Sequence, residues 1–305
     1  MIHVLCEISV GKAFWGDMSN DTKISIGFLG YGTRALDALM EHDKFEVKYF
    51  LAPKARLCQD VYDAAERYGD RLTLEIVENN DDLASRLAEI DDVDCFLMNA
   101  CNIILNADVL EKMPFYNIHP GRLENNRGHH PHLWTVLLGE ETDEIVLHEV
   151  VPLIDEGKVI AYEDISIPAD ANSLEVLDLL EDMIPKLLDR LYLYLRGEVT
   201  YAKQVYGGTY RHVLRPEDYR FDWSDIDKPD FDLMMDRKIR ARYMHHGAFF
   251  VYEGNRIYVD RLISHTTSAN VSSLTVKFIG DDEVKVDCES SEYVFHVNKI
   301  QPHQE

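Results

Sequence analysis

The chain has 305 residues, which is enough for two domains with separate hydrophobic cores. Its formal net charge of −24 at pH 7 disfavours non-specific binding to nucleic acids or anionic membranes, because both are negatively charged. No apolar run reaches the ~18 to 20 residues of a membrane-spanning helix, and residues 1–22 lack the basic start of a signal peptide. The five cysteines have no metal-knuckle or redox spacing, so we expect reduced thiols in a cytoplasmic protein.

From residue 23 to residue 100, patterns of buried strands alternate with patterns of amphipathic helices. The strands are short apolar runs, and the helices repeat apolar residues at spacings of three and four. Strands are expected at 23–30, 45–53, 72–77 and 93–100, and helices at 33–42, 61–69 and 82–90. This alternation predicts a Rossmann-like α/β domain with a mostly parallel sheet and crossover helices.

The remainder of the chain changes character near residue 205. Two more strands are expected at 144–151 and 158–167, followed by a long amphipathic helix at 173–197 that Pro185 is expected to kink or divide. Beyond a linker, many short strands with Gly and Asp turns predict a small, OB-like β-barrel. We therefore expect an N-terminal extension, an α/β domain and a barrel-like domain, at residues 1–22, 23–205 and 206–305.

A glycine-rich turn follows the first strand. Gly30, Gly32 and Ala35 match the Gly-x-Gly-x-x-Gly/Ala fingerprint of dinucleotide sites, which by itself is a weak signal. A nicotinamide site also needs an acid at the end of the second strand, where this chain has Leu51-Ala52-Pro53. We therefore interpret the segment as a tight turn into a helix, whose N-terminus can still face a phosphate or carboxylate.

Three polar side chains suggest acyl-transfer chemistry. Asn117 and His119 are two positions apart, so in an extended segment they point to the same side. Asp155 follows on a later loop, before Gly157, which we expect to let the backbone turn sharply. A single buried histidine is more often structural. However, an amide, an imidazole and a carboxylate together are suited to stabilising an oxyanion and moving a proton.

The segments that carry these residues, NIHPGRLENNRG and LHEVVPLIDEGKVI, resemble the 10-formyltetrahydrofolate-dependent formyltransferase family. The resemblance extends through PHLWTVLLGEE, RPEDYRFDW and HHGAFFVYEGNRI, and covers roughly residues 23 to 305. Gly121, Glu124 and Asn126 depart from the family pattern, which has a Ser, a Pro and an aromatic residue there. These departures concern the shape of the loop and the choice of acceptor, and they leave the three polar residues intact.

The resemblance implies transfer of a formyl group from 10-formyltetrahydrofolate to a primary amine. Asn117 and His119 would stabilise the oxyanion, and Asp155 would orient His119 and help to remove the amine proton. The folate would lie along one loop and face another. The residues that the resemblance places there are Asn102, Ile103, Ile104 and Leu105 on the first loop, and Val151, Leu153, Ile154 and Glu156 on the second.

For the acceptor, the sequence favours a nucleotide-linked amino sugar over tRNA. In methionyl-tRNA formyltransferase, a basic insertion after the second strand grips the tRNA, whereas residues 52–69 here carry only Lys54 and Arg56 before acids appear. A nucleotide diphosphate needs only a few donors, which we expect to be Arg34, Arg122 and Arg127, with His129 at the lip of the cleft. Methionyl-tRNA and another small amine stay as alternatives.

Two other classes of function are compatible with the resemblance. In formyltetrahydrofolate hydrolysis water replaces the amine, but that relative differs at the asparagine position, so Asn117 favours transfer. A folate-binding or interaction module without catalysis is the second alternative, and the intact trio argues against it. His129, His130 and His132 lack a partnering carboxylate or cysteine set, so no metal site is predicted. We predict a packed structural role for His148, and a homodimer as a candidate assembly.

Overall fold

The computed structural model describes residues 22–267, 274–288 and 291–303. The extension predicted for residues 1–22 therefore lies, apart from Thr22, outside the described residues. Two compact units alternate along the chain. Unit 1 contains the chain up to Arg127 together with Glu144–Glu163 and Glu181–Thr209, and unit 2 contains Gly128–Asp143, Asp164–Leu180 and the chain from Tyr210 onward. The boundary predicted near residue 205 falls close to the end of the last segment of unit 1.

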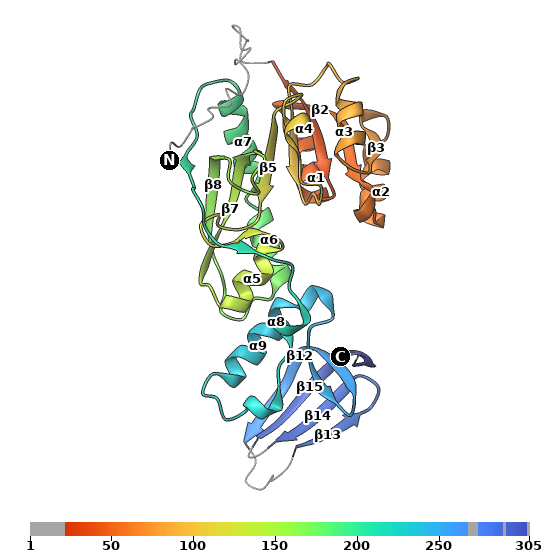
Figure 1. Ribbon diagram of the computed structural model, residues 1–305, viewed down its shortest axis with the longest axis vertical. Helices are drawn as coiled ribbons and strands as arrows, with labels where there is room; N and C mark the ends of the chain where they lie inside the picture. Colours follow the sequence, from red (N-terminus) through yellow and green to blue (C-terminus); the bar gives the residue numbers. More distant parts are fainter. Residues whose placement is uncertain (1–21, 268–273, 289–290, 304–305) are drawn as a thin grey trace, which may run out of the picture. The chain divides into compact units, whose positions relative to one another are not determined.

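The larger sheet has eight strands in the order β3-β2-β1-β4-β5-β7-β8-β9 (Figure 1). The strands from β3 to β5 in this order pair in parallel, and β7 pairs antiparallel with β5. This arrangement confirms the predicted α/β fold with a mostly parallel sheet. The strand bounds are β1 Ile24–Gly30, β2 Phe45–Pro53, β3 Thr73–Val77, β4 Cys95–Asn99, β5 Phe115–His119, β7 Thr142–Glu149, β8 Lys158–Ser166 and β9 Lys203–Gln204.

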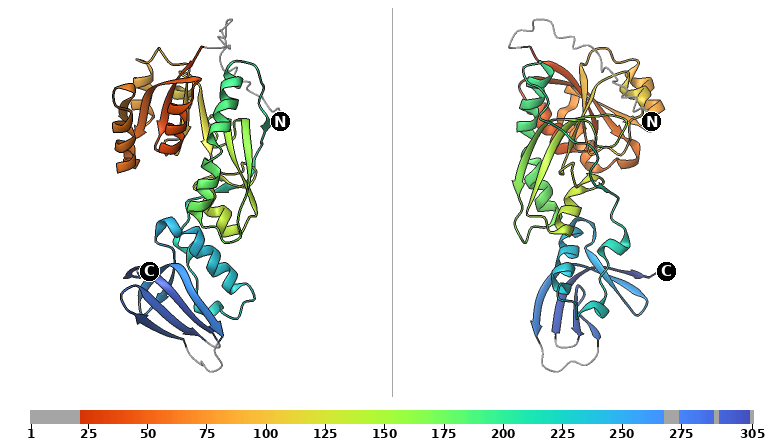
Figure 2. Two further views of the ribbon diagram at one scale, coloured as in Figure 1. Left: turned by 180° about the vertical axis from the view of Figure 1, so that it is seen from behind. Right: turned by 60° about the vertical axis from the view of Figure 1, so that its left-hand side comes forward.

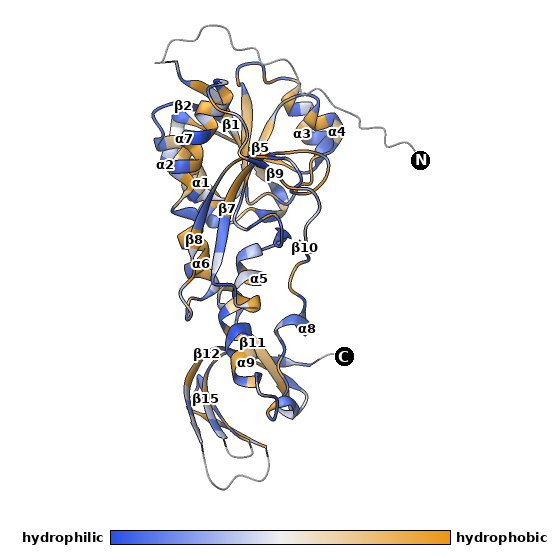
Figure 3. Ribbon diagram, turned by 90° about the vertical axis from the view of Figure 1, so that its left-hand side faces the viewer, coloured by the Kyte–Doolittle hydropathy of each residue, from blue (hydrophilic) through white to orange (hydrophobic). Residues whose placement is uncertain are grey.

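Helices connect the parallel strands, as the alternating pattern predicted (Figure 2). α1 carries hydrophilic and hydrophobic residues together (Figure 3), and its buried residues Ala35, Leu36 and Leu39 have helical spacing. The helix bounds are α1 Thr33–Glu41, α2 Gln59–Tyr68, α3 Asn80–Leu87, α4 Ala107–Leu110, α5 Pro131–Leu138, α6 Ser173–Glu181, α7 Ile184–Leu195, α8 Pro216–Tyr219 and α9 Phe231–Ala241. Within the described residues, no helix is both long enough and apolar enough to cross a membrane.

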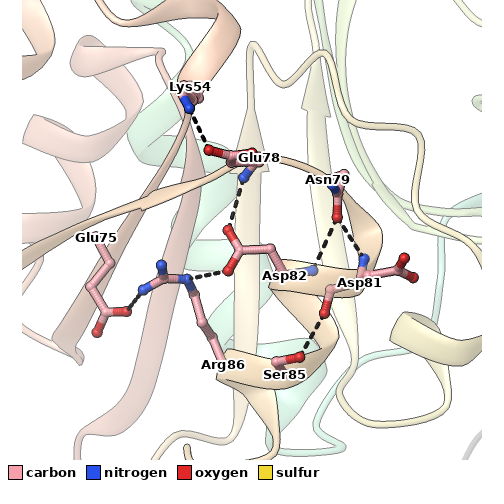
Figure 4. A network of polar contacts seen from close by, with 8 residues as sticks. All are labelled: Lys54, Glu75, Glu78, Asn79, Asp81, Asp82, Ser85 and Arg86. Carbon is pink, nitrogen blue, oxygen red and sulfur yellow. Dashed lines mark hydrogen bonds and ion pairs between the residues drawn. The ribbon is translucent and has the colours of Figure 1, made fainter.

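A network of side chains fixes the start of α3 (Figure 4). The Oδ1 of Asn79 accepts hydrogen bonds from the main-chain N–H groups of Asp81 and Asp82, at 3.0 and 3.1 Å, which caps the helix. The Oδ1 of Asp82 also accepts a hydrogen bond from the Nε of Arg86 at 3.1 Å, and Arg86 forms an ion pair with Glu75 on β3. The helix therefore begins where its free N–H groups find an acceptor, and it is tied to the edge of the sheet.

The glycines at and just after the end of β1 are required by the close approach of β4. Gly30 has a φ of 144°, and a Cβ there would lie 1.9 Å from the main-chain oxygen of Asn99. A Cβ on Gly32 would lie 1.8 Å from the Oδ1 of the same asparagine. Packing against Asn99 thus accounts for the Gly-x-Gly pattern without a bound dinucleotide.

Pro185 divides the predicted helix of residues 173–197 into α6 and α7. It stands in the first turn of α7, where its missing N–H and fixed φ are tolerated. α7 then packs against α1 in unit 1.

The second sheet belongs to unit 2 and has five strands in the order β11-β12-β15-β14-β13. All of its pairings are antiparallel, which confirms the predicted β-rich C-terminal fold. α9 packs on this sheet through Phe231, Met235 and Ile239, which share a core cluster with Trp223 and Phe295. The strand bounds are β11 Ala248–Tyr252, β12 Asn255–Thr267, β13 Thr275–Ile279, β14 Glu283–Cys288 and β15 Ser291–Pro302.

Candidate active site

Strand β5 brings Asn117 and His119 to one face of the large sheet, because every second side chain of a strand points the same way. β5 ends at His119, at the edge where the parallel strands have their carboxyl ends. The antiparallel pairing with β7 places His148 directly opposite Asn117. Three polar side chains therefore meet where β5 and β7 run side by side.

His119 is buried and contacts a neighbour through each ring nitrogen. Its Nε2 is 2.8 Å from the main-chain oxygen of Asn126. A carbonyl oxygen only accepts, so Nε2 carries the hydrogen. The other nitrogen, Nδ1, is 3.6 Å from the Oδ2 of Asp155. Nδ1 is thus the nitrogen that gains or loses a proton, and it faces a carboxylate.

Asp155 lies on the loop between β7 and β8 and has a left-handed backbone, with a φ of 53°. Aspartate and asparagine adopt this conformation more readily than most residues. Our expectation that Gly157 supplies the turn's backbone freedom is wrong, since Gly157 has no positive φ. It must be glycine because a Cβ there would lie 1.7 Å from the main-chain oxygen of Glu149. This close return of the loop brings Asp155 to His119.

His148 is the residue of this site whose contacts were missed from the sequence. It is buried, its Nε2 is 3.1 Å from the Nδ2 of Asn117, and its Nδ1 is 2.8 Å from the main-chain oxygen of Glu149. Its Nε2 is also 3.5 Å from the Oδ1 of Asp155. The strand pattern around His148 was recognised, but its position opposite Asn117 depends on the pairing of β5 with β7.

Arg127 ties together the two loops that flank His119. Its guanidinium forms an ion pair with Glu156 and donates to the main-chain oxygen of Gly208 at 3.2 Å. Asn126, whose carbonyl receives the His119 hydrogen, precedes Arg127, and Asp155 precedes Glu156. We infer that the ion pair sets the distance between the two partners of His119. The acceptor role predicted for Arg127 and the folate role predicted for Glu156 stay predictions.

The other residues predicted to bind the amine substrate lie in both units. In unit 1, Arg34 pairs with Glu181 and Asp182, at 3.5 and 2.5 Å, and Arg122 lies 3.2 Å from the Oε1 of Glu144. In unit 2, His129 is exposed, and its ring centroid is 6.3 Å from that of Tyr210. Each arginine predicted to bind the substrate thus already forms an ion pair with a carboxylate. An anionic substrate would have to displace that carboxylate or share the arginine with it. Among the described residues, no group of His, Cys, Asp or Glu is arranged to hold a metal ion.

Removal of the Arg127 guanidinium is expected to lower stability and activity together. Arg127→Met leaves Glu156 without its partner, at a cost on the order of 2 kcal/mol, because the 28% exposure of that carboxylate moderates the penalty of a buried charge. The unfolding temperature and kcat should both fall. Arg34→Met, at an exposed ion pair, should leave the unfolding temperature and the yield of folded protein unchanged. An unchanged unfolding temperature with a raised KM for the acceptor would show instead that Arg127 binds substrate.

The first loop predicted to hold the folate, and the residue before the second, pack at one apolar cluster in unit 1. Ile103 on the first loop and Val150, just before the second, pack against the cluster that contains Leu105. By contrast, Ile104 and Leu153 expose 60% and 62% of their surface. Exposed aliphatic side chains can contact the flat face of an aromatic ring.

Asn80, the first residue of α3, holds the first of these loops. Its Nδ2 donates to the main-chain oxygen of Ile104 at 2.9 Å, and its Oδ1 accepts from the main-chain N–H of Asn106 at 3.2 Å. Asn80 therefore holds the C-terminal end of the residues that the resemblance assigns to the folate, on either side of Leu105.

Cys101, at the start of this loop, offers a test of whether the loop is closed. Burial raises the pKa of its thiol to about 11, so little reactive thiolate is present near neutral pH. Cys58 is exposed and serves as the internal reference. We expect iodoacetamide to modify Cys101 far more slowly than Cys58, and more slowly still with reduced folate, as read by peptide mass spectrometry. Modification of Cys101 at the same rate as Cys58 would show that the loop opens freely.

Comparison with known proteins relates both sequence and fold to formyltransferases. A methionyl-tRNA formyltransferase from Rickettsia bellii is 24% identical over 182 residues, which are 59% of this chain and 58% of that protein. The chain spans about half the length of the curated relatives it matches. No family model matches the sequence.

Two solved structures share the fold. HypX from Aquifex aeolicus, in complex with tetrahydrofolic acid, has a TM-score of 0.63 at 18% identity, covering 91% of this chain and 45% of HypX. A sugar N-formyltransferase from a Shewanella species has a TM-score of 0.62 at 15% identity, covering 82% of this chain and 99% of that protein. The fold is therefore that of the α/β formyltransferases. The sequence matches relate the chain to proteins of the same fold.

Proposed function

We propose that this protein transfers a formyl group from 10-formyltetrahydrofolate to a primary amine. The observation that supports this proposal best is the arrangement of Asn117, His119 and Asp155 at the carboxyl end of β5. The Nδ1 of His119 lies 3.6 Å from Asp155, and Asn117 shares the face of the strand with His119. An amide N–H, an ionisable imidazole and a carboxylate are the groups that acyl transfer to an amine requires.

The residues of the two folate loops fit the proposed donor. Ile104 and Leu153 offer exposed aliphatic surface, and the Asn80 contacts fix the main chain of the first loop. When bound, 10-formyltetrahydrofolate supplies the formyl carbon that an amine attacks. Asn102, Ile103, Ile104 and Leu105 would contact it from one side, with Val151, Leu153, Ile154 and Glu156 facing them.

Each catalytic residue has a distinct task in this proposal. The Nδ2 of Asn117 donates a hydrogen bond to the formyl oxygen, where negative charge develops. The Nδ1 of His119, when protonated, donates to the same oxygen, and the carbonyl of Asn126 holds the ring in place through Nε2. Asp155 stabilises the protonated ring and accepts the amine proton, directly or through a water. That proton would pass to the folate nitrogen as its bond to the formyl carbon breaks, so that tetrahydrofolate leaves.

For the acceptor, we propose the amino group of a nucleotide-linked sugar. The net charge of −24 argues against tRNA, although the curated relatives are methionyl-tRNA formyltransferases. The segment after β2, where a basic tRNA-gripping insertion would stand, carries Lys54, whose ammonium already forms an ion pair with Glu78 (Figure 4). A diphosphate needs only a few positively charged donors, and Arg34, Arg122, Arg127 and His129 remain the proposed ones. The cytoplasm remains the proposed location, and a homodimer the proposed assembly.

The proposal is tested by incubating the purified chain with 10-formyltetrahydrofolate and separate acceptors. These are nucleotide-linked amino sugars, methionyl-tRNA and small amines, each analysed for a mass increase of one formyl group. We expect formylation of a nucleotide-linked amino sugar and none of the tRNA. Formylation of tRNA alone would overturn the proposed identity of the acceptor. Breakdown of 10-formyltetrahydrofolate without any formylated amine would indicate hydrolysis.

A further inference from the structure

A chain of hydrogen bonds in unit 1 determines how the side-chain amide of Asn117 is oriented. The main-chain carbonyl of Glu149 receives the Nδ1 hydrogen of His148 at 2.8 Å. A neutral imidazole carries one hydrogen, so the Nε2 of His148 is an acceptor. Asn117 must therefore present its Nδ2 to His148, at 3.1 Å, and not its Oδ1. The orientation of the amide thus follows from the protonation state of a second histidine.

We propose that His148 is a positioning residue for Asn117, and that protonation of His148 stops formyl transfer. The proposal rests on the proposed function, because it assigns the second Nδ2 hydrogen of Asn117 to the formyl oxygen. Neutral His148 accepts the first of these hydrogens and so fixes the direction of the second. Protonated His148 carries a hydrogen on Nε2 as well and no longer accepts one.

Protonation also changes the partner that His148 prefers. An Nε2 hydrogen favours either a flipped Asn117 amide, with Oδ1 as its acceptor, or the Oδ1 of Asp155, 3.5 Å away. In the first case the Asn117 hydrogen leaves the formyl oxygen. In the second case the proton of His148 competes with that of His119, whose Nδ1 lies 3.6 Å from the same carboxylate. In both arrangements the formyl oxygen loses a hydrogen-bond donor.

The other charged groups around His148 do not offer an equivalent partner. The carboxylate of Glu149 accepts from the hydroxyl of Tyr194 at 2.6 Å and lies 3.9 Å from the ammonium of Lys158. His119 faces His148 across Asp155. Asp155 is therefore the carboxylate toward which a protonated His148 turns.

Two substitutions separate this role from simple packing. His148→Leu keeps much of the volume and removes the acceptor, so kcat should fall about tenfold, the size expected for one lost hydrogen bond, with little change in the KM for the donor. His148→Gln offers an oxygen at about the place of Nε2 and cannot be protonated. It should keep most of kcat and lack the fall in kcat at acidic pH that we expect for wild type. An acid limb that is identical in wild type and His148→Gln, or a wild-type kcat in His148→Leu, would overturn the proposal.

A second measurement does not depend on catalysis. Long-range proton–nitrogen NMR spectra of histidine-labelled wild type distinguish the two imidazole tautomers, and comparison with His148→Gln assigns the His148 ring. We expect the Nδ1–H form at neutral pH, and a shift of the Asn117 amide signals as the ring gains its second proton. An Nε2–H form at neutral pH would overturn the proposal. If the expected tautomer is found in a chain that makes no formylated product, the positioning contact stands and the proposed function fails.

Discussion

His119→Gln is expected to lower kcat about 10²–10⁴-fold, the usual contribution of a positioned acid or base. Glutamine places an amide N–H at about the position of Nε2, so the hydrogen bond to the carbonyl of Asn126, 2.8 Å in the native chain, has a replacement. It has no equivalent of Nδ1, the nitrogen that faces Asp155. The variant therefore removes the ionisable group and keeps the packing, and steady-state kinetics with the formylated amine as readout measures the loss.

His42→Gln is the matched control for this substitution. His42 also lies in unit 1 and also faces an acid, with its Nε2 3.3 Å from the Oδ1 of Asp189, and the other contacts of its ring are with Asp43, Lys44 and Phe45. Its kcat should stay at the wild-type value. If His119→Gln and His42→Gln behaved alike, the proton-carrying role of His119 would have to be abandoned.

Asp155→Asn is expected to lower kcat to a similar extent, on the order of 10²–10⁴-fold, with an unchanged unfolding temperature. Asparagine tolerates the left-handed backbone of this position as well as aspartate does, so the loop should keep its shape. Alanine would be a poorer choice, since a left-handed conformation costs an ordinary side chain about 1–2 kcal/mol. Asparagine has no negative charge to stabilise a protonated His119 and no base to take the amine proton.

Asp189→Asn controls for the loss of one negative charge in unit 1. Asp189 is exposed and pairs with His42 outside the site, so neither kcat nor stability should change measurably. Wild-type turnover in Asp155→Asn, measured beside this control, would mean that the carboxylate takes no part in the reaction.

Much of the fold followed from local patterns in the sequence. The run FEVKYFLAP forms β2 with the predicted bounds, and its alternation with α1 and α2 led to the parallel sheet. Pro185 was expected to kink or divide a long helix and does divide it, because a proline is tolerated in the first turn of α7. These features depend on neighbouring residues, which a single sequence contains.

The parts of the site that were not predicted depend on contacts between distant segments. The position of His148 opposite Asn117 requires the register of β5 against β7. The ion pair between Arg127 and Glu156 joins two loops that the sequence separates. The reason for Gly157 is the carbonyl of Glu149 that passes beside it. None of these has a local pattern, so they became visible only in the folded chain.

The most direct measurement follows the fate of the formyl carbon. A donor labelled with an isotope in its formyl group is mixed with the purified chain and a nucleotide-linked amino sugar, and the products are separated. The account predicts that the label appears in the N-formylated sugar with the wild-type chain, and at least about a hundredfold more slowly with Asp155→Asn. Label recovered as free formate, or left on the donor by the wild-type chain with every amine tried, would contradict formyl transfer at this site.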